Sequence, residues 1–528
     1  MNLRFRTLVL LSAVLVLAMT ASARAQTAAA KPKPVAPAPQ PKPITGMAVW
    51  LTASLEDLVQ MADFVSQVPE AHGLYLTPME QNLVAQIRMM NPEQSRAALV
   101  PLFTAIARQL YTGRLNGAEV GSDIRFSKKS LPDEKIREMM NESAGSTERL
   151  IKLLSPQIVD YRMLLRLLNR LKEIQTVEVW GALPKFKKPL KLGVVDPAVV
   201  ELKKRLVSLG FQITNLDSRF DEQTDAAVAD IQRQLKLKPD RIVSPGGGTQ
   251  KYLETPIAER IEQVRADLEK LRWLPQNPTD RYIFVNLAFS SLLLMDRSRA
   301  NPVVFNFKTI NGRVERKTPS MVDKIYQIIL NPYWTVPPTV FIKDKVEMIR
   351  HLGYWEVEDY FAQNNFIVVS ENFRQQYSPS QIDWRNITSS SGNGFFIRQK
   401  PNYFNALGVV KFGLTNGEAI YLHDTGEREL FSEENRLRSS GCVRLEQPLE
   451  MAEYLLAGTK WDRFAIENHV ARPGEVLDRE TPIEVKNQIP VYMLPITSHY
   501  ASDKVMRFTA DVYGHNQSIR AQTSYSLF

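Results

Sequence analysis

The chain has 528 residues, of which 44% are hydrophobic and 23% charged, and this composition excludes an intrinsically disordered protein. It is long enough for about two to four domains of ordinary size. Its single cysteine, Cys442, cannot form a disulfide within the chain. The formal net charge of +9 comes without the dense basic run that would indicate nucleic-acid binding.

The first 43 residues predict export followed by a spacer. A basic head, an apolar run from Leu8 to Met19 and the sequence Ala23-Arg24-Ala25 are typical of a cleavable signal peptide over residues 1–25, with an uncleaved anchor as the alternative. Cleavage removes three arginines and no acid, which lowers the net charge from +9 to +6. A mildly basic exported protein favours an anionic polymer or a membrane surface. Residues 26–43 contain the tract KPKPVAPAPQPKP and are expected to form a semi-rigid linker.

Residues 44–190 predict a helical scaffold. Asn91-Pro92 is typical of a helix start, and apolar residues at helical spacing follow it as far as Leu110. Ser155-Pro156 opens a second helix whose apolar stripe runs from Ile158 to Leu171. Because stripes of this kind pack in a core, we expect no chemistry from this region.

Residues 191–255 predict a small module of three helices. One helix face ends at Gly210, a second short helix carries Val228 and Ile231, and a Gly246-Gly-Gly248 turn follows. The order of these elements and of the LGF and D-x-IV segments resembles the small peptidoglycan-binding module. A purely structural insert is the alternative. Ser218 and Asp221 replace glycines of that module, so the binding groove is expected to be altered.

The rest of the chain predicts a strand-rich domain with an insertion. A charged amphipathic helix over Ile257 to Leu274 leads into β-branched and aromatic runs, which start at Tyr282, Ser290 and Val303. Residues 256–342 and 397–475 are assigned to one domain, and residues 343–396 form an aromatic-rich insertion, for which a small hydrophobic core of its own is the structural alternative to any further role. Residues 476–528 are expected to be late strands that pack on the scaffold or on this domain.

Two short segments carry the chemistry, Tyr421-Leu-His-Asp-Thr425 and Ser439-Ser-Gly-Cys-Val-Arg444. In a strand over Ala419–His423, Tyr421 and His423 share one face. A thiol is only slightly ionised at neutral pH, so an adjacent imidazole must take its proton or stabilise the thiolate, and His423 is the candidate. Gly441 permits a sharp turn and the close approach of a backbone N–H to a substrate oxygen, as an oxyanion hole requires. The other five histidines have no such context, and no spacing is typical of a metal site.

Four motifs in order, Arg281-Tyr-Ile-Phe-Val-Asn286, Thr318-Pro319, Asn331-Pro-x-Trp334-x-Val-Pro337 and HDT…SSGCVR, resemble the L,D-transpeptidase catalytic domain of YkuD type. The preceding scaffold and module are similar to the large periplasmic subgroup of that family. The resemblance implies an α+β multidomain protein, in which a helical scaffold and the three-helix module accompany a mainly-β catalytic domain. It also implies that the insertion is a mobile capping subdomain over the active site.

The resemblance implies roles for individual residues. Cys442 is the nucleophile and His423 the base, oriented by the backbone carbonyl of Asp424 or by its carboxylate. Arg444 either holds a substrate carboxylate or braces its loop, and Ser440 stands where the usual family signature has histidine. The oxyanion and orienting residues are then Gly441, Tyr421 and Asp424, and the substrate-binding residues Thr425, Ser439, Ser440, Arg444 and Trp334.

The implied reaction joins two peptidoglycan stem peptides in the periplasm of a Gram-negative bacterium. The Cys442 thiolate attacks the bond that precedes D-alanine in a donor tetrapeptide, D-alanine leaves, and a side-chain amine of a second stem resolves the thioester as a 3-3 cross-link. A free D-amino acid or a lipoprotein is another acceptor. No cofactor or metal is expected, residues 192–255 are expected to contact glycan strands, and carbapenems are expected to acylate the thiol. The alternatives are a hydrolase that uses the same thioester and a non-catalytic wall-binding scaffold.

Overall fold

The computed structural model describes residues 47–178, 180–389 and 392–525. The predicted signal peptide (1–25) and linker (26–43) lie outside these residues. Residues 1–45 and 46–528 form separate units, and the second is described here. Among the described residues, no helix has both the length and the apolar character needed to cross a membrane.

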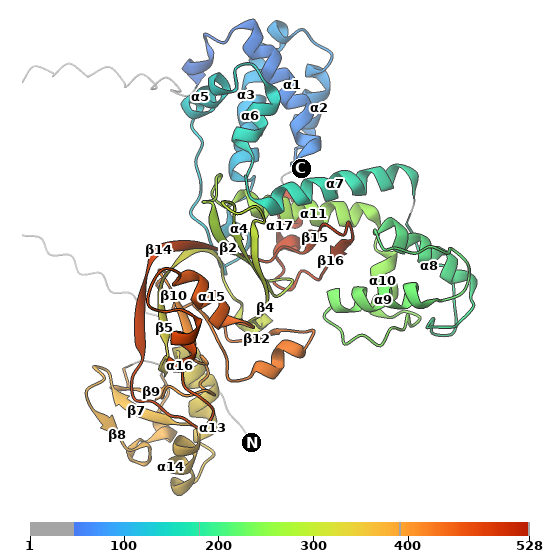
Figure 1. Cartoon of the computed structure of the whole chain (residues 1–528). Helices are drawn as coiled ribbons and strands as arrows, with labels where there is room; N and C mark the ends of the chain where they lie inside the picture. Colours follow the sequence, from blue (N-terminus) through green and yellow to red (C-terminus); the bar gives the residue numbers. More distant parts are fainter. Residues whose placement is uncertain (1–46, 179, 390–391, 526–528) are drawn as a thin grey trace, which may run out of the picture. The chain divides into compact units, whose positions relative to one another are not determined.

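The first helices enclose a core of their own, drawn in blue in Figure 1. Its helices begin at polar N-caps such as Ser54, Thr77 and Asn91, as expected where backbone N–H groups need acceptors. The predicted start at Asn91-Pro92 is confirmed. The elements of this core are η1 (Met47–Trp50), α1 (Leu55–Ala71), α2 (Pro78–Ile87), α3 (Pro92–Thr112), α5 (Asp133–Ser143) and α6 (Thr147–Leu154), whereas α4 (Gly117–Val120) buries Val120 in a second core.

The second predicted stripe does not pack in that core. It forms α7 (Val159–Val177), whose buried face lies against α11 (Ile257–Arg272) in a core shared with the three-helix module. The region assigned as one scaffold, residues 44–190, therefore divides near Leu154. Periodicity identifies a buried helix face but contains no information about its partner.

The three-helix module consists of α8 (Pro197–Ser208), α9 (Glu222–Gln234) and α10 (Gly248–Glu254). Asp221, one of the residues that replace glycines of the module, accepts the Thr224 N–H at 2.9 Å as the N-cap of α9. Its other oxygen lies 2.5 Å from Nζ of the buried Lys203. Asp221 thus connects the start of α9 to α8 within the module.

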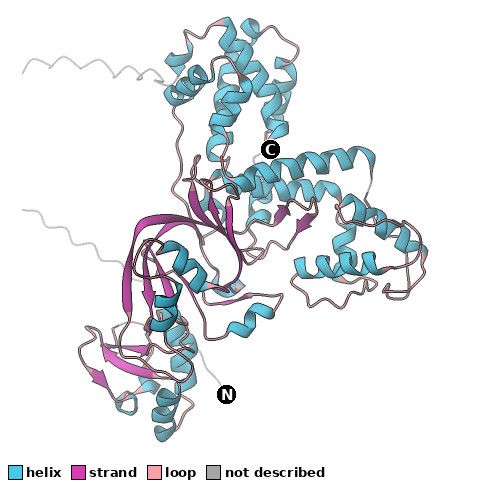
Figure 2. Ribbon diagram, in the orientation of Figure 1, coloured by secondary structure: helices cyan, strands magenta, loops and turns pink. Residues whose placement is uncertain are grey.

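The predicted helix is confirmed as α11, and four charged side chains near its end are buried. Lys270 pairs with Asp267 at 2.7 Å and Arg272 with Glu269 at 3.2 Å, and all four side chains are fully buried. The second half of the helix is covered by α7, α17 (His515–Tyr525) and β15 (Ser498–Tyr500), and every residue from Ala266 to Arg272 is buried. Figure 2 shows it among other helices and short strands.

The main sheet closes on itself, because β14 pairs with both β2 and β5. The strand order is β1-β5-β10-β11-β13-β4-β3-β2-β14, and β12 pairs with β4 at one side. Apolar side chains of these strands and of two helices fill the interior. The strands are β1 (Ile124–Arg125), β2 (Arg281–Asn286), β3 (Ser291–Asp296), β4 (Val303–Gly312), β5 (Ser320–Leu330), β10 (Val410–Leu414), β11 (Leu422–His423), β12 (Leu437–Ser439), β13 (Val443–Leu445) and β14 (Thr481–Leu494). The helical elements beside them are η2 (Val314–Arg316), η6 (Arg428–Ser432), α15 (Pro448–Leu455) and α16 (Arg463–His469).

The insertion, called the cap from here on, has its own aromatic core and a sheet of order β6-β9-β7-β8. Apolar residues from Val336 to Ile397 fill that core, so the alternative of a small core is confirmed and the core extends beyond the predicted 343–396. Its elements are β6 (Trp334–Thr335), α12 (Pro338–Val340), the π-helix η3 (Phe341–Val346), α13 (Glu347–Ile349), α14 (Tyr354–Gln363), β7 (Phe366–Ser370), β8 (Gln376–Tyr377), η4 (Pro379–Gln381), η5 (Trp384–Asn386) and β9 (Phe395–Gln399).

The tail differs from the strands expected over 476–528. It contains β14, β15 and β16 (Met506–Phe508), but it ends in the helix α17. This helix has one deeply buried apolar residue, Ile519, and its other buried side chains include His515 and Asn516, so it has no apolar period to recognise. The α+β multidomain class, with helical region, three-helix module and mainly-β domain, is confirmed.

Candidate active site

A cavity of about 470 Å³ lies between the closed sheet and the cap. The cap contributes Lys345, Asn364 and Phe366 to its wall. Of the ten residues predicted for the site, two do not line the cavity. These are Asp424 and Gly441, whose neighbours in the sequence do line it. The others line it together: Trp334, Tyr421, His423, Thr425, Ser439, Ser440, Cys442 and Arg444.

Two adjacent parallel strands bring the thiol and the imidazole to this cavity. In β11 and β13, His423 pairs with Arg444, and Leu422 pairs with Val443. The Val443 N–H donates to Tyr421 O at 3.2 Å, so Cys442 lies directly before β13 at the level of Tyr421. The strand expected over Ala419–His423 is shorter than predicted, because Ala419 has a φ of +57°, which a strand cannot contain.

His423 is buried, with its Nδ1 only 2.5 Å from the carbonyl oxygen of Asp424. A carbonyl can only accept, so Nδ1 carries the hydrogen and Nε2 keeps a free lone pair. The Asp424 carboxylate points elsewhere and accepts the Val409 N–H at 2.9 Å and Arg428 at 2.5 Å. Of the two orienting groups considered from the sequence, the carbonyl is the one bonded to the ring.

Burial and the neighbouring Arg444 charge lower the pKa of His423 to about 3. Lys411 acts in the same direction, and the bond to the Asp424 carbonyl only partly opposes them. The imidazole is therefore neutral at physiological pH and available as a proton acceptor.

Burial also raises the pKa of the Cys442 thiol. Hydrogen bonds with the backbone and side chain of Tyr421 and the positive charge of Lys411 act to lower it, but burial outweighs them. The thiol donates to the carbonyl of Ala419 at 3.6 Å. The Tyr421 and His423 rings stand edge to face with centroids 5.6 Å apart, on the shared face that the strand alternation predicts. Thiol and imidazole are thus both uncharged in this state.

Gly441 has a φ of +127°, in the region that favours glycine, and turns the chain sharply before Cys442. Its N–H donates to Ser439 Oγ at 3.2 Å, while that hydroxyl donates to the Cys442 carbonyl at 2.6 Å. Over the described part of the chain, the Cys442 N–H has no hydrogen-bond partner. The free backbone donor at this turn therefore belongs to Cys442, and Gly441 contributes its conformation.

Residues 280–465 match the family model described as the L,D-transpeptidase catalytic domain. This segment therefore matches an L,D-transpeptidase catalytic domain. Residues 195–246 match a second model, described as "Putative peptidoglycan binding domain", which coincides with α8 and α9. The predicted family resemblance is confirmed for both segments.

The chain is similar to a protein of Haemophilus influenzae named "Putative L,D-transpeptidase", with 27% identity over 280 residues. The alignment covers 52% of this chain and 53% of the relative, so it spans about half the length of each. Solved L,D-transpeptidases from Xylanimonas cellulosilytica (15% identity, 59% of this chain and 100% of that one, TM-score 0.18) and Stackebrandtia nassauensis (11%, 60% and 96%, TM-score 0.22) are also similar.

Within the matched segment, Arg444 of β13 braces the loop that follows β11. Its Nη1 donates to Thr425 Oγ1 at 3.1 Å and to Glu427 at 2.5 Å. Trp334 is partly buried and packs against Phe366 of the cap, with ring centroids 6.2 Å apart. Arg444 thus adopts one of the two roles considered from the sequence, and Trp334 connects the cavity wall to the cap.

Sequence reasoning missed three cations beside the site. Lys411 lies directly opposite His423 in the sheet, and its Nζ is 4.1 Å from the centroid of the Tyr421 ring. The side chains of Arg313 and Arg316 both donate to Ser440 Oγ. A lone lysine in the apolar strand Val410–Leu414 was a usable signal, whereas the arginines look like an ordinary solvated loop.

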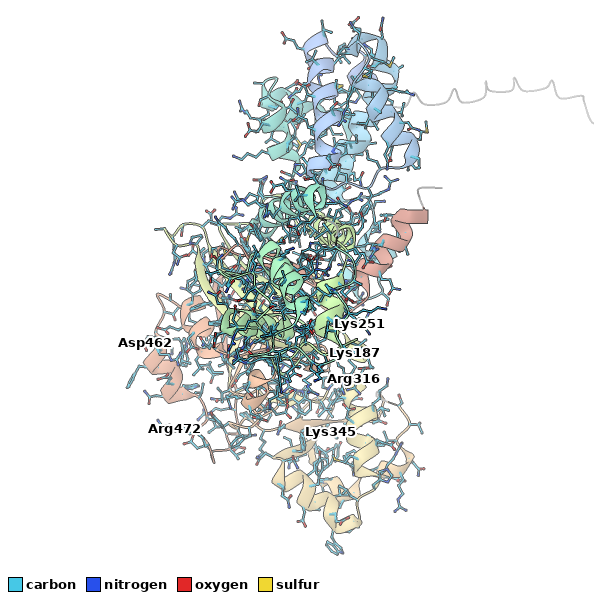
Figure 3. All side chains as sticks on the ribbon, turned by 90° about the vertical axis from the view of Figure 1, so that its right-hand side faces the viewer. Lys187, Lys251, Arg316, Lys345, Asp462 and Arg472 are labelled. Atoms are coloured by element: carbon cyan, nitrogen blue, oxygen red, sulfur yellow. The ribbon has the colours of Figure 1, made fainter. Side chains whose placement is uncertain are left out.

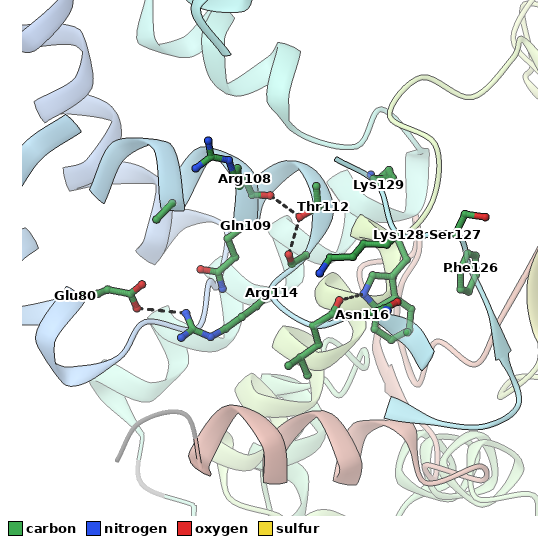
Figure 4. Close-up of a pocket in the computed structure, with 15 residues that line it drawn as sticks. Glu80, Arg108, Gln109, Thr112, Arg114, Asn116, Phe126, Ser127, Lys128 and Lys129 are labelled. Carbon is green, nitrogen blue, oxygen red and sulfur yellow. Dashed lines mark hydrogen bonds and ion pairs between the residues drawn. The ribbon is translucent and has the colours of Figure 1, made fainter. Parts of the chain in front are cut away.

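A second cavity, of about 350 Å³, lies where α3 meets the end of α11 (Figure 4). Its wall is basic, but Arg114 donates to Tyr75 O at 2.9 Å and pairs with Glu80 at 3.3 Å. Lys129 donates to the Leu274 carbonyl at 2.8 Å. These cations connect the two cores, and none of the predicted site residues lies there. Among the described residues there is also no cluster of three or more His, Cys, Asp or Glu that could hold a metal ion.

Proposed function

We propose that the protein is a peptidoglycan L,D-transpeptidase that uses Cys442 as nucleophile and His423 as general base. The observation that carries this proposal is that a neutral imidazole on β11 and a thiol directly before the adjacent parallel strand β13 line one cavity, with Nδ1 fixed by the Asp424 carbonyl. A fixed tautomer leaves Nε2 as the proton acceptor, as nucleophilic catalysis requires.

In the first half-reaction, Nε2 of His423 accepts the thiol proton as Sγ attacks the carbonyl carbon that precedes D-alanine in a tetrapeptide stem. The Cys442 N–H donates to the oxyanion of the tetrahedral intermediate. Collapse of the intermediate breaks the C–N bond, and His423 returns the proton to the departing D-alanine amine. A thioester to Cys442 and a neutral His423 remain.

In the second half-reaction, an amine from an acceptor stem attacks the thioester. His423 takes a proton from the amine and returns it to the leaving sulfur, so an amide forms and the thiol is restored. The product is a 3-3 cross-link when the amine belongs to the diamino acid of a second stem. Free D-amino acids and lipoproteins are further acceptors of the same chemistry.

The electrostatics of the site favour proton transfer over a preformed ion pair. The pKa of His423 is lowered to about 3 and that of Cys442 is raised, both chiefly by burial, so the resting pair is uncharged. The proton then moves only as the C–S bond forms, and Lys411 and Arg444 stabilise the developing thiolate. The cap over the cavity limits the access of water to the thioester.

Peptidoglycan as substrate is supported by the module over residues 195–246. Such a substrate requires a location outside the cytoplasm, and we assign the periplasm of a Gram-negative bacterium. Carbapenems, which present a strained acyl group of the same kind, should acylate Cys442. The two alternatives are a hydrolase that gives the thioester to water and a wall-binding scaffold without catalysis.

The experiment incubates the protein with a tetrapeptide donor and an amine acceptor and identifies products by mass spectrometry. A cross-linked dimer and free D-alanine support the proposal, whereas tripeptide alone indicates the hydrolase. Cys442→Ala is the control for background conversion. Pelleting with peptidoglycan sacculi without any turnover, and equally in Cys442→Ala, would indicate the scaffold.

A further inference from the structure

Three side chains connect the loop before Cys442 to the cap. They are Ser440 of that loop, Asp344 of the cap, and Arg316, which lies between the other two. Arg316 donates through Nη1 to Ser440 Oγ at 3.0 Å. The same guanidinium holds both carboxylate oxygens of Asp344 in η3 of the cap, at 2.6 and 2.7 Å. Figure 3 labels Arg316 close above Lys345, the neighbour of Asp344 in the cap.

The pair between Arg316 and Asp344 has the geometry of a strong interaction. A bidentate guanidinium–carboxylate contact combines charge with a fixed relative orientation. The Arg316 side chain is 15% exposed and that of Asp344 37%, so water screens the contact only from the side of the carboxylate. Hydrogen bonding and charge from Arg316 lower the pKa of Asp344, which therefore remains ionised at neutral pH. The contact specifies where η3 lies relative to η2, the helical turn that carries Arg316.

The segment that carries Arg316 is itself rigid. The Gly312 N–H donates to Thr318 Oγ1 at 2.8 Å, and the Gly312 carbonyl accepts the Tyr513 hydroxyl at 2.7 Å. A Cβ at Gly312 would lie 2.3 Å from the Arg316 carbonyl oxygen, so the loop closes tightly on that glycine. Arg316 is thus fixed to the sheet, whereas its two partners lie on the cap and on the nucleophile loop.

The contact of Arg316 with Ser440 lies in the same loop as the free N–H of Cys442. Ser440 is exposed and stands two residues before Cys442, and its hydroxyl also accepts from Arg313 at 3.2 Å. The Arg313 N–H holds the Ser439 carbonyl at 3.1 Å. These bonds, together with those of Ser439, determine the direction of the Cys442 N–H.

We infer that Arg316 is a positioning residue that couples closure of the cap to the placement of the Ser439–Cys442 loop. When Asp344 holds the guanidinium, Nη1 is directed at Ser440 and the loop takes the position described above. When the cap moves away with Asp344, the guanidinium is free to turn, and Ser440 loses one of its two arginine contacts. The inference rests on the proposed function, because the reacting groups are those of Cys442 and His423.

The test compares Arg316→Ala, Arg316→Lys and Asp344→Asn with the wild-type protein. Arg316→Lys keeps the positive charge but cannot form the bidentate contact, so it preserves folding while breaking the link. We expect kcat to fall about tenfold or more with KM nearly unchanged in all three variants, because a misplaced oxyanion donor affects the transition state rather than binding. Glu347→Gln is the matched control, since its pair with Arg350 is also in the cap but exposed.

Two further readouts report on the link itself. Alkylation of Cys442 by iodoacetamide should become faster in the three variants, because the cap opens more often. Hydrogen exchange at the amides of residues 439–442 should increase in Asp344→Asn, although that substitution lies in the cap. A double variant Arg316→Ala/Asp344→Asn should behave like Arg316→Ala alone, since both changes remove one link.

The coupling would be overturned if Arg316→Lys and Asp344→Asn were folded and had the same kcat, the same rate of Cys442 alkylation and the same hydrogen exchange as the wild-type protein. An inactive wild-type protein in which Asp344→Asn still alters exchange at 439–442 would refute the proposed function and support the coupling. An active wild-type protein whose Asp344→Asn variant changes none of the three readouts would support the function and refute the coupling.

Discussion

Two clusters of ionisable side chains respond to removal from water in opposite ways, one by pairing its charges and the other by losing them. On α11, Asp267, Glu269, Lys270 and Arg272 are fully buried and remain as ion pairs. At the cavity, the buried His423 and the half-buried Cys442 are neutral groups. Removal from water is costly for a charge unless a counter-charge accompanies it, so a buried group either pairs or loses its charge.

The difference follows from the partners that each group has. Burial alone would lower the pKa of Arg272, but Tyr161 and Glu269 more than offset it, so the pKa is raised. The guanidinium also donates to the His72 carbonyl at 2.5 Å. His423 has only a carbonyl as partner and faces the cations Arg444 and Lys411, so its protonated form is disfavoured. The first arrangement contributes to the fold, and the second provides a base.

The largest expected effect is on the nucleophile. Cys442→Ala should abolish turnover and covalent labelling by a carbapenem, because no other thiol exists in the chain. The substitution is small, so the melting temperature should remain close to that of the wild type. Mass spectrometry of the intact protein after exposure to carbapenem measures the label. Undiminished labelling of Cys442→Ala would exclude Cys442 as the acyl carrier.

Removal of the neutral base should have the next largest effect. We expect His423→Gln to reduce kcat by roughly 10²-fold or more, because no side chain then accepts the thiol proton. Binding of the donor stem, measured by calorimetry with the tetrapeptide, should be retained. Equal kcat in wild type and variant would show that the thiol ionises without His423.

The ion pairs of α11 should affect stability rather than turnover. Glu269→Gln leaves the buried Arg272 without its counter-charge and should lower the free energy of unfolding by about 3–5 kcal/mol. Glu262→Gln on the same helix is the matched control, since its pair with Arg265 is partly exposed and is expected to contribute about 0–1 kcal/mol. Urea denaturation followed by circular dichroism measures both. Equal losses in the two variants would mean that burial does not set the difference.

The smallest expected effect is the response of kcat to acid. Since the pKa of His423 is lowered to about 3, the base stays neutral and kcat should change little between about pH 7.5 and pH 5. An imidazole with an ordinary pKa near 6.5 would be mostly protonated at about pH 5. A steep loss of kcat with a midpoint near pH 6.5 would contradict the neutral resting pair.

The same shift predicts a sign for stability. The unfolded chain takes up a proton at His423 below about pH 6.5, whereas the folded chain does so only near pH 3, so the free energy of unfolding should fall as pH decreases through this window. His423→Gln should remove the contribution of this residue and flatten the dependence. Thermal melts of wild type and variant between about pH 7 and pH 5 measure it.

The sequence by itself determined the features that depend on neighbours along the chain. The helix N-cap at Asn91, the helices of the three-helix module and the shared face of Tyr421 and His423 follow from local geometry and spacing. The lone cysteine and its motif indicated the family that the match over residues 280–465 bears out.

Only the tertiary structure decided what depends on contacts between distant segments. The partner of α7, the burial of the charged side chains from Asp267 to Arg272 in α11, and the position of Lys411 opposite His423 depend on residues far apart in the chain. The proton position on His423, the occupied Gly441 N–H and the link from Ser440 through Arg316 to Asp344 are likewise fixed by neighbours in space. Residue spacing reports which face is buried or polar, whereas partners, protonation and direction are set by packing.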